Sequence, residues 1–427
     1  MSPLWLLAIF IFLVAINTPI AISLGLAAVI AYSATFGFDG LLNLAISLYQ
    51  GARSFPLIAI PLFVFAGAIM NTTGISQRLI AFVSAIVGFV RGGLAMVNIG
   101  TSLFFAEISG SAVADVAAIG SILTPAMKKR GYPANFTAAI TSSSASLAII
   151  IPPSIPMILY GAMTDTSIVQ LFVAGIIPGL LGAFMMFLLA YGFAVRYNFP
   201  VEETFQLRRV WQTFKEASWA LLVPVIILGG IFGGIFTATE AAGLAVATAL
   251  FVGTFIYREL NLRSLINAMT DGVIQTAVVM LLVAVSAFLG LYLTQTRVPQ
   301  QLTVWMLGIS QDPILVLAML NVLFLFVGMF LHGAAAIILV VPIVMPIANA
   351  IGVDPVQFGI MVTLNIAIGQ QTPPVASVLM TACSIAKADV WDVTKVNVWF
   401  IGVLLLLLIL VTYVPYISLV LVEAFYR

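Results

Sequence analysis

Apolar residues fill most of the chain in long runs, and short polar breaks separate these runs. Each run is apolar on nearly every face, which is typical of helices surrounded by lipid rather than of amphipathic helices on a soluble protein. Because one bilayer crossing needs about 20 apolar residues, the pattern predicts roughly a dozen membrane elements and no sizeable water-soluble domain. The runs lie near residues 4–16, 20–37, 56–71, 79–90, 134–163, 167–195, 219–236, 241–257, 273–296, 356–384 and 397–423.

The most polar segment lies in the middle of the chain, over residues 196–218, and we interpret it as a loop between two halves. Basic residues are enriched in cytoplasmic loops, which places this segment in the cytoplasm together with the basic run 128–130. The two apolar runs between these segments return the chain to the same side, so the two assignments agree. The side of the N-terminus and the exact number of spans stay open. The basic residues of the loop are Arg196, Arg208, Arg209 and Lys215.

Two segments far apart in the chain share one pattern of residues. Leu94–Asn98 reads LAMVN and Leu317–Asn321 reads LAMLN, and a glycine follows each asparagine after twelve residues. Further on, a proline precedes a proline pair by 27 residues in both segments. Such collinear matches across about 60 residues indicate two homologous halves. We therefore predict a first repeat over 1–195, a second repeat over 219–395 and a C-terminal membrane helix over 396–427.

Each predicted half contains a helical hairpin followed by a broken helix. The hairpins lie at about 94–127 and 313–350, and the broken helices at about 134–163 and 356–384. A Gly/Ser break divides the first hairpin into halves of about 16 residues, or roughly 24 Å of helix, which is short of the roughly 30 Å hydrocarbon core. We therefore predict an all-α polytopic membrane protein with two inverted repeats, whose re-entrant hairpins meet tip to tip near the middle of the membrane.

The broken helices carry polar residues beside a proline pair. A serine-rich stretch over 141–146 precedes Pro152-Pro153, and Gly369–Thr372 precedes Pro373-Pro374. Proline lacks an N–H and clashes with the carbonyl one turn earlier, so each break frees carbonyl oxygens. Neutral hydroxyl, amide and carbonyl oxygens suit a monovalent cation better than Ca²⁺ or Mg²⁺, whose sites usually include carboxylates. The pattern therefore predicts two Na⁺ sites, one in each half.

Composition excludes several classes of protein. Only 7% of the 427 residues are charged and 63% are hydrophobic, whereas soluble proteins have about 25% and 45–50%. A net charge of +1 leaves no large basic surface for nucleic acid. The single cysteine, Cys383, excludes disulfides, and the single histidine, His332, cannot form a zinc site alone. Neither a phosphate-binding loop motif nor a hydrolase motif occurs, so we do not expect an enzyme.

Four short strings resemble one family of membrane proteins. They are Ser109–Asp115 (SGSAVAD), Ile151–Ser154 (IPPS), Thr237–Ala242 (TATEAA) and Gly369–Pro374 (GQQTPP). They are similar to the large membrane subunit of tripartite ATP-independent periplasmic (TRAP) transporters, and the similarity extends over essentially the whole chain. The third string departs from the family at Ala238, where the family usually has proline.

The resemblance implies Na⁺-coupled uptake of an organic acid across the bacterial inner membrane by an elevator movement. It also implies two partners, which are a small four-helix membrane subunit and a soluble periplasmic substrate-binding protein. Among the substrates of the family we favour a sialic acid over a C4-dicarboxylate. The alternatives are a Na⁺/dicarboxylate symporter that works without a binding protein, and a channel.

Carrying the ion sites of the family over, residue by residue, gives two sets of Na⁺ contacts. The first set consists of Ser109, Gly110, Ser111, Ser143, Ser144 and Pro152, and the second of His332, Gly333, Gly369 and Thr372. The substrate is expected between the two hairpin tips. Its candidate contacts are Asp115, Ser154, Gln370 and Gln371.

Several of these residues also have a structural interpretation. Asp115 and Glu107 flank the first tip, and each is either a functional carboxylate inside the membrane or a structural one. In the structural interpretation, Asp115 is bound to backbone N–H groups. The serines of 142–146 either bind a ligand or only allow close helix packing. His332 either contacts an ion or the substrate, or completes a hydrogen bond at its tip. We interpret Glu240 as the mark of a turn in water between two spans.

Overall fold

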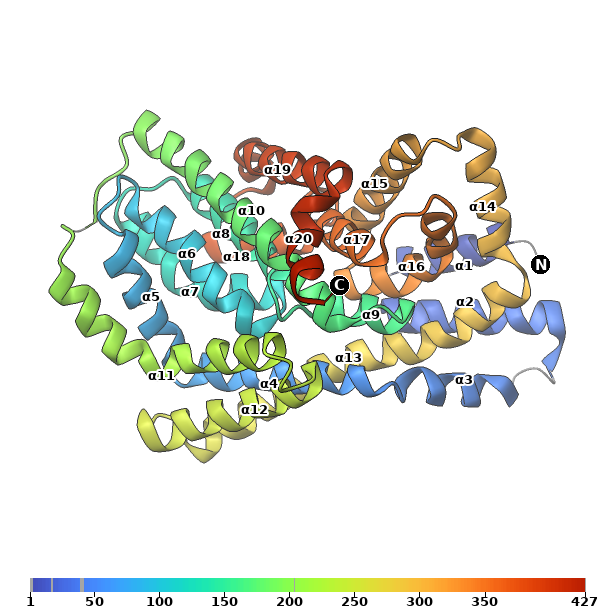
Figure 1. Cartoon of the computed structure of the whole chain (residues 1–427), viewed down its shortest axis with the longest axis horizontal. Coiled ribbons are helices and arrows are strands. Elements are labelled where there is room, and N and C mark those ends of the chain that lie inside the picture. The colour runs from blue at the N-terminus through green and yellow to red at the C-terminus, as the bar shows by residue number, and fades with distance from the viewer. Residues whose placement is uncertain (1–2, 17, 39–41, 203, 427) are drawn as a thin grey trace.

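The computed structural model describes residues 3–16, 18–38, 42–202 and 204–426, and these ranges are almost entirely helical (Figure 1). Short 3₁₀ turns, η2 (Phe55–Ile58) and η3 (Leu147–Ile149), precede α4 and follow α8, and a π turn, η4 (Val252–Ile256), follows α12. The α-helices are α1 Pro3–Ala15, α2 Ile20–Phe36, α3 Leu42–Ala52, α4 Ala59–Thr72, α5 Ile75–Val87, α6 Gly93–Ser109, α7 Ala112–Lys129, α8 Ala134–Ser146, α9 Ile155–Thr164, α10 Ile168–Arg196, α11 Leu207–Phe232, α12 Ala238–Phe251, α13 Leu262–Gln295, α14 Val298–Ile309, α15 Pro313–Phe330, α16 Gly333–Ala350, α17 Pro355–Gly369, α18 Ser377–Ala386, α19 Val390–Tyr413 and α20 Pro415–Tyr426.

Eight helices in the described ranges are long and apolar enough to cross a membrane. They contain 18 to 34 residues, which corresponds to about 27–51 Å of helix. The expectation of an all-helical, multi-pass membrane protein is therefore confirmed. The eight are Phe55–Thr72, Ile168–Arg196, Leu207–Phe232, Ala238–Ile256, Leu262–Gln295, Pro313–Phe330, Gly333–Ala350 and Val390–Tyr413.

The longest helix, α13, organises an outer group of helices. It packs against α2, α3 and α4, while α12 packs on α4 and α11 packs on α5. In Figure 1 these helices run along the lower edge and the left side of the molecule. We call α2–α5 and α11–α13 the outer group, and α6–α10 with α15–α20 the inner group.

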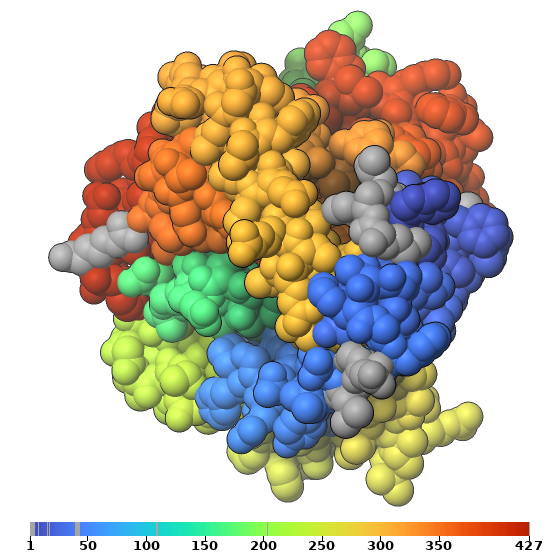
Figure 2. Space-filling view, turned by 90° about the vertical axis from the view of Figure 1, so that its right-hand side faces the viewer, coloured from blue at the N-terminus to red at the C-terminus, as the bar shows by residue number. Residues whose placement is uncertain are grey.

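The inner group mixes segments from the two ends of the chain. Helix α8 packs against α7 but also against α18 and α19, and α9 packs against α16. The same mixing is visible on the surface, where segments from the early, middle and late parts of the chain lie side by side (Figure 2). A buried core of apolar side chains is therefore shared between the predicted halves and not confined to either.

The predicted hairpins and broken helices coincide with pairs of observed helices. Helices α6 and α7 cover the first hairpin, and α15 and α16 cover the second. The first broken helix consists of α8, η3 and α9, and the second of α17 and α18. Helices α15 and α16 each have 18 residues, so by length and composition alone they can also cross a membrane.

Two predicted boundaries differ from the structure. Residues 207–218 of the predicted loop form the first turns of α11, because Leu207, Val210, Trp211 and Phe214 recur at helical spacing. The C-terminal helix begins at Val390 instead of 396, since Asp389 caps it by accepting from the backbone N–H of Trp391 at 2.9 Å. It ends at Tyr413, two residues before Pro415, which begins α20.

Basic side chains gather at one end of the inner group. Several contacts join the helix ends there: Lys128 Nζ donates to the carbonyl oxygen of Ala386 at 2.9 Å, Arg130 pairs with Glu202 at 3.2 Å, and the Gly92 N–H donates to Pro200 O at 3.0 Å. We call this end the basic end. Its basic residues are Arg91, Lys128, Lys129, Arg130, Arg196 and Lys387.

Acidic side chains gather at a second end. Tyr160 Oη donates to Pro355 O at 2.7 Å, and Gln357 Nε2 donates to Thr412 O at 2.9 Å. Tyr413 Oη also donates to Ile314 O at 3.3 Å. These contacts bring together the end of α9 and the starts of α15 and α17. We call this end the acidic end, and its acidic residues are Asp165, Asp312 and Asp354.

Candidate functional site

The turn of the first hairpin lies against the break of the first broken helix. Gly110 ends α6 with φ +58°, a left-handed conformation that glycine adopts without steric cost. A Cβ at this position would lie 3.1 Å from both the Pro153 carbonyl oxygen and the Ile155 nitrogen. The absence of a side chain therefore allows the backbone of the tip to reach the backbone of the break.

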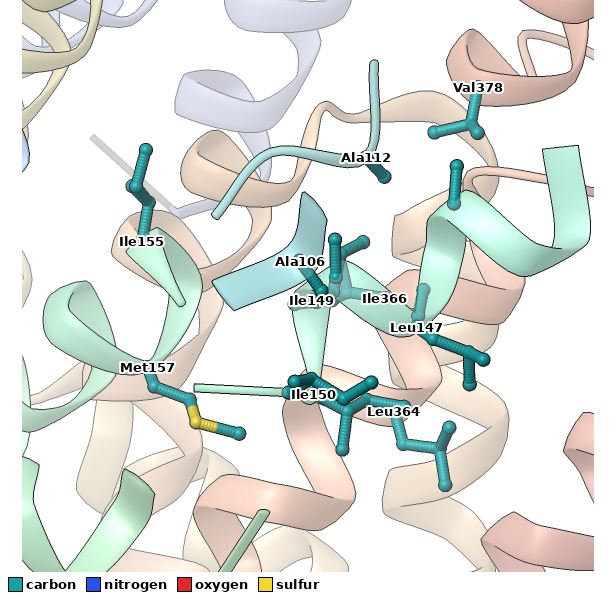
Figure 3. Close-up of a cluster of buried hydrophobic side chains, with 14 of the residues drawn as sticks. Ala106, Ala112, Leu147, Ile149, Ile150, Ile155, Met157, Leu364, Ile366 and Val378 are labelled. Atoms are coloured by element: carbon teal, nitrogen blue, oxygen red, sulfur yellow. The ribbon is translucent and has the colours of Figure 1, made fainter. Parts of the chain in front are cut away.

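The first break is a buried, non-helical segment over residues 150–154. The carbonyl oxygens of Ile151 and Pro152 accept no hydrogen bond from the described residues. Buried carbonyls are almost always paired, so these two oxygens are available to a ligand. Figure 3 shows a cluster of buried apolar side chains, among them Ala106, Ile149 and Ile366, beside Ile150 at the start of this segment.

Ser154, a predicted substrate contact, caps α9. Its Oγ donates to Ile149 O at 2.6 Å and accepts from the Met157 N–H at 3.4 Å, and the residue is fully buried. These bonds give the side chain a structural role at the break. Contact with a substrate stays a prediction.

The second tip also lies against the second break. A Cβ on Gly333 would lie 2.8 Å from Gln370 Nε2, and one on Gly369 would lie 2.5 Å from the Cα of Gly328. The two helices α15 and α17 thus approach at the level of their backbones. Gln370 is buried, and its Oε1 accepts from Ser377 Oγ at 3.4 Å.

The remaining predicted residues of the second site lie around this contact. The Thr372 hydroxyl donates to Ile368 O at 2.9 Å, while the carbonyl oxygens of Thr372 and Pro373 accept no hydrogen bond from the described part of the chain. His332 is exposed and its side chain makes no hydrogen bond to described residues. The carbonyl oxygens of this break are therefore also available to a ligand.

Matching polar contacts hold each broken helix to its hairpin. Ser144 Oγ donates to Asn98 Oδ1 at 2.8 Å, and Asn365 Nδ2 donates to Asn321 Oδ1 at 2.7 Å. Asn98 and Asn321 occupy the same place in the two LAM motifs, and Ser144 and Asn365 each lie eight residues before the proline pair. Related positions thus make related contacts in the two segments.

Ser143 faces away from its neighbour Ser144 and bonds to the other half. Its Oγ lies 2.8 Å from Gln371 Oε1 and 2.7 Å from Asn397 Oδ1. All three residues are fully buried. Asn397 was absent from the sequence-based site. The available signal was a single amide at the point where the polar first turns of α19 give way to its apolar remainder.

The carboxylates near the first tip have different surroundings. Asp115 is fully buried in the first turn of α7, where the helix dipole favours a negative charge, and it interacts with neighbouring groups. Glu107 is half-buried near the end of α6.

Glu240 forms a capping box with Thr237, since Glu240 Oε2 accepts from the Thr237 N–H at 2.8 Å. That cap marks the start of α12, which agrees with a turn at this position.

Of the residues assigned to the first Na⁺ site, the side chain of Ser109 lies outside the described residues. Ser111 occupies the N-cap position of α7 without a side-chain capping bond, and it interacts with neighbouring groups. Within the described ranges no group of three or more His, Cys, Asp or Glu side chains could hold a metal ion. The first break offers the carbonyl oxygens of Ile151 and Pro152, and the second those of Thr372 and Pro373. Neutral oxygens of this kind suit a monovalent cation.

A family model described as "Tripartite ATP-independent periplasmic transporter, DctM component" matches residues 7–417. The chain belongs to this family. It is therefore a TRAP transporter permease and not an enzyme, and it is a multi-pass protein of the bacterial inner membrane.

Relatives with different substrates in their names are similar to this DctM component. The isethionate TRAP transporter permease protein DctMQ of Oleidesulfovibrio alaskensis is 41% identical over 94% of this chain and 63% of that protein, so the chain spans less than two thirds of that relative. The C4-dicarboxylate large permease protein DctM of Vibrio cholerae is 37% identical over 94% and 93%. The sialic acid large permease protein SiaM of the same species is 37% identical over 88% of both chains.

Two solved structures share the fold. The YdaH transporter of Alcanivorax borkumensis aligns with a TM-score of 0.65 over 90% of both chains, at 14% sequence identity. MtrF of Neisseria gonorrhoeae aligns with a TM-score of 0.61 over 89% of this chain and 85% of that chain, at 12% identity. At such identities the likeness concerns the fold alone.

Proposed function

We propose that this chain is the Na⁺-coupled transport subunit of a tripartite system that takes up an organic acid. The observation that carries the proposal is the close approach of each hairpin to a broken helix whose carbonyl oxygens lack partners among the described residues. In the first hairpin the turn at Gly110 meets the backbone of the break, and in the second Gly333 meets the side chain of Gln370. We assign one Na⁺ to the first tip and break, at Ser109, Gly110, Ser111, Ser143, Ser144 and Pro152. We assign a second Na⁺ to His332, Gly333, Gly369 and Thr372.

We further propose that the two halves are inverted repeats that move as an elevator. The ends of α6 and α7 away from their turn lie at the basic end, with Arg91 and Lys129. The corresponding ends of α15 and α16 lie toward the acidic end, with Asp312 and Asp354. Since basic residues favour the cytoplasmic side, this charge pattern supports hairpins that open to opposite sides of the membrane.

The membrane potential can supply energy for such transport. One net positive charge that moves inward gains about 2.3 kcal/mol per 100 mV. Two or more Na⁺ ions that accompany a monoanion therefore favour accumulation of the substrate. The driving force needs no nucleotide, in agreement with the absence of a phosphate-binding loop motif from the sequence.

The substrate class is an organic anion. Relatives are named for isethionate, C4-dicarboxylate, sialic acid and 2,3-diketo-L-gulonate, and their identities with this chain lie between 35% and 41%. These similar values do not separate the substrates. A sialic acid stays our predicted substrate, and we propose a small four-helix membrane subunit and a periplasmic binding protein as partners.

Reconstitution tests the proposal. Proteoliposomes that contain this chain and its small membrane partner, supplied with the binding protein, are expected to accumulate the labelled acid only under an inward Na⁺ gradient. A panel of sialic acid, succinate and isethionate identifies the substrate by competition. Accumulation by this chain alone would favour a stand-alone symporter, and flux without saturation or accumulation would favour a channel.

A further inference from the structure

Helix α19 carries an amide that contacts the second break and α8, the helix that leads into the first break. Asn397 is fully buried, and its Oδ1 lies 2.7 Å from Ser143 Oγ of α8. Its Nδ2 lies 3.4 Å from both the backbone oxygen and the Oε1 of Gln371 in the second break. Ser143 lies 254 residues before Asn397 in the chain, and Gln371 lies 26 residues before it.

The three side chains form one set of hydrogen bonds. Ser143 has a single hydroxyl hydrogen, while two amide oxygens lie within 2.8 Å of its Oγ. The hydroxyl therefore donates to one amide oxygen at a time, and a change at either amide alters the bond to the other. Gln371 Nε2 has no hydrogen-bond partner among the described residues, so only one side of this amide is held by protein.

We propose that Asn397 is a positioning residue that couples the two breaks. Asn397 holds the Gln371 amide and the Ser143 hydroxyl in fixed positions relative to each other. An ion bound at one break therefore favours the side-chain arrangement that binds an ion at the other break. Buried networks of this kind respond as a unit, because each bond polarises the next in a low-dielectric interior. The inference rests on the proposed function, since it assumes that the breaks bind Na⁺.

The second polar contact of α19 is separate from this set. Thr412 accepts from Asn321 Nδ2 at 3.1 Å, fifteen residues further along the helix, or about 22 Å. Thr394 lies one turn from Asn397, and among the described residues its hydroxyl bonds only to Val390 O of its own helix, at 2.7 Å. Thr394 is therefore a matched control on the same helix.

Thermal unfolding of the purified full-length chain tests the inference with Na⁺ alone as the probe. A bound ion raises the Tm by mass action, and K⁺ keeps the ionic strength constant. Asn397→Leu replaces the amide by a side chain of similar shape. In this variant the half-saturating Na⁺ concentration is expected to rise about ten-fold, and Tm is expected to increase less steeply with Na⁺ concentration. Thr394→Val is expected to respond like the unchanged chain. Asn397→Thr keeps a donor and an acceptor, so its half-saturating Na⁺ concentration is expected to rise less. This variant provides the test if Asn397→Leu does not fold.

A double-variant cycle separates positioning from an independent effect. If Asn397 acts through Gln371, adding Asn397→Leu to Gln371→Leu produces little further change in Na⁺ affinity. Shifts that simply add, or a half-saturation within two-fold of the unchanged chain for Asn397→Leu, would overturn the inference. Failure of the unchanged chain to gain Tm with Na⁺ would instead count against the proposed function itself.

Discussion

At the residue scale, glycine determines how closely the hairpin turns approach the breaks. The spacing of Gly110 and Gly333 after their asparagines identified both turns from the sequence. The contact between Gly369 and Gly328 could not be foreseen in this way, because the pattern of one helix contains no information on which backbone passes it. The same reason explains why Asn397 was missed, since its polar partners come from distant segments.

Gly110→Ala is expected to weaken the first tip. A left-handed alanine costs about 1–2 kcal/mol, and the contact of the new Cβ with Pro153 and Ile155 adds about 1–3 kcal/mol. The matched control is Gly131→Ala, since Gly131 has φ +85° and open space around its Cβ position. The difference in Tm between the two variants, measured with and without Na⁺, isolates the contact. Equal losses in both variants would show that the approach of tip and break contributes nothing.

At the element scale, proline and glycine predicted the helix breaks well. The predicted ends of the first hairpin, 94–127, lie within two residues of those of α6–α7, and the predicted ends of the second, 313–350, are those of α15–α16. The predicted loop was too long because charge was interpreted as a sign of irregular structure. In fact Arg208, Arg209 and Lys215 alternate with apolar residues at helical spacing, and a helix with one polar face forms there.

The contact between α7 and α18 gives a prediction at this scale. Lys128 Nζ donates to Ala386 O at the C-terminus of α18, where the helix dipole favours a positive charge. Lys128→Met is expected to lower the free energy of unfolding by about 1 kcal/mol, because the carbonyl loses a charged partner. Lys129→Met provides the control, since Lys129 is exposed and neighbours it on the same helix. Chemical unfolding in mild detergent measures both, and a loss no greater than that of the control would contradict the role of this bond.

At the scale of the whole molecule, the sequence indicated membrane helices and two related halves, but not their packing. The pattern of apolar and polar positions did not predict that α13 packs against α2, α3 and α4, or that α8 packs against α18 and α19. Apolar faces are alike in a membrane protein, so their pairing depends on small residues and on a few buried polar contacts. The bond between Ser143 and Gln371 is one such contact, and it joins segments 228 residues apart.

The proposal that the two helix pairs open to opposite sides of the membrane can be tested by labelling cysteines. Cys383 is the only cysteine, so Cys383→Ser provides a background without thiols. In this background Gln311→Cys places a thiol before α15, and Lys129→Cys places one at the end of α7; both positions are exposed. If basic segments face the cytoplasm, a membrane-impermeant maleimide should label Gln311→Cys in intact spheroplasts and Lys129→Cys only after permeabilisation. Arg209→Cys should behave like Lys129→Cys, because both lie in segments assigned to the cytoplasm. Labelling of the first two positions from the same side would show that the pairs open together, and the inverted arrangement of the halves would then be wrong.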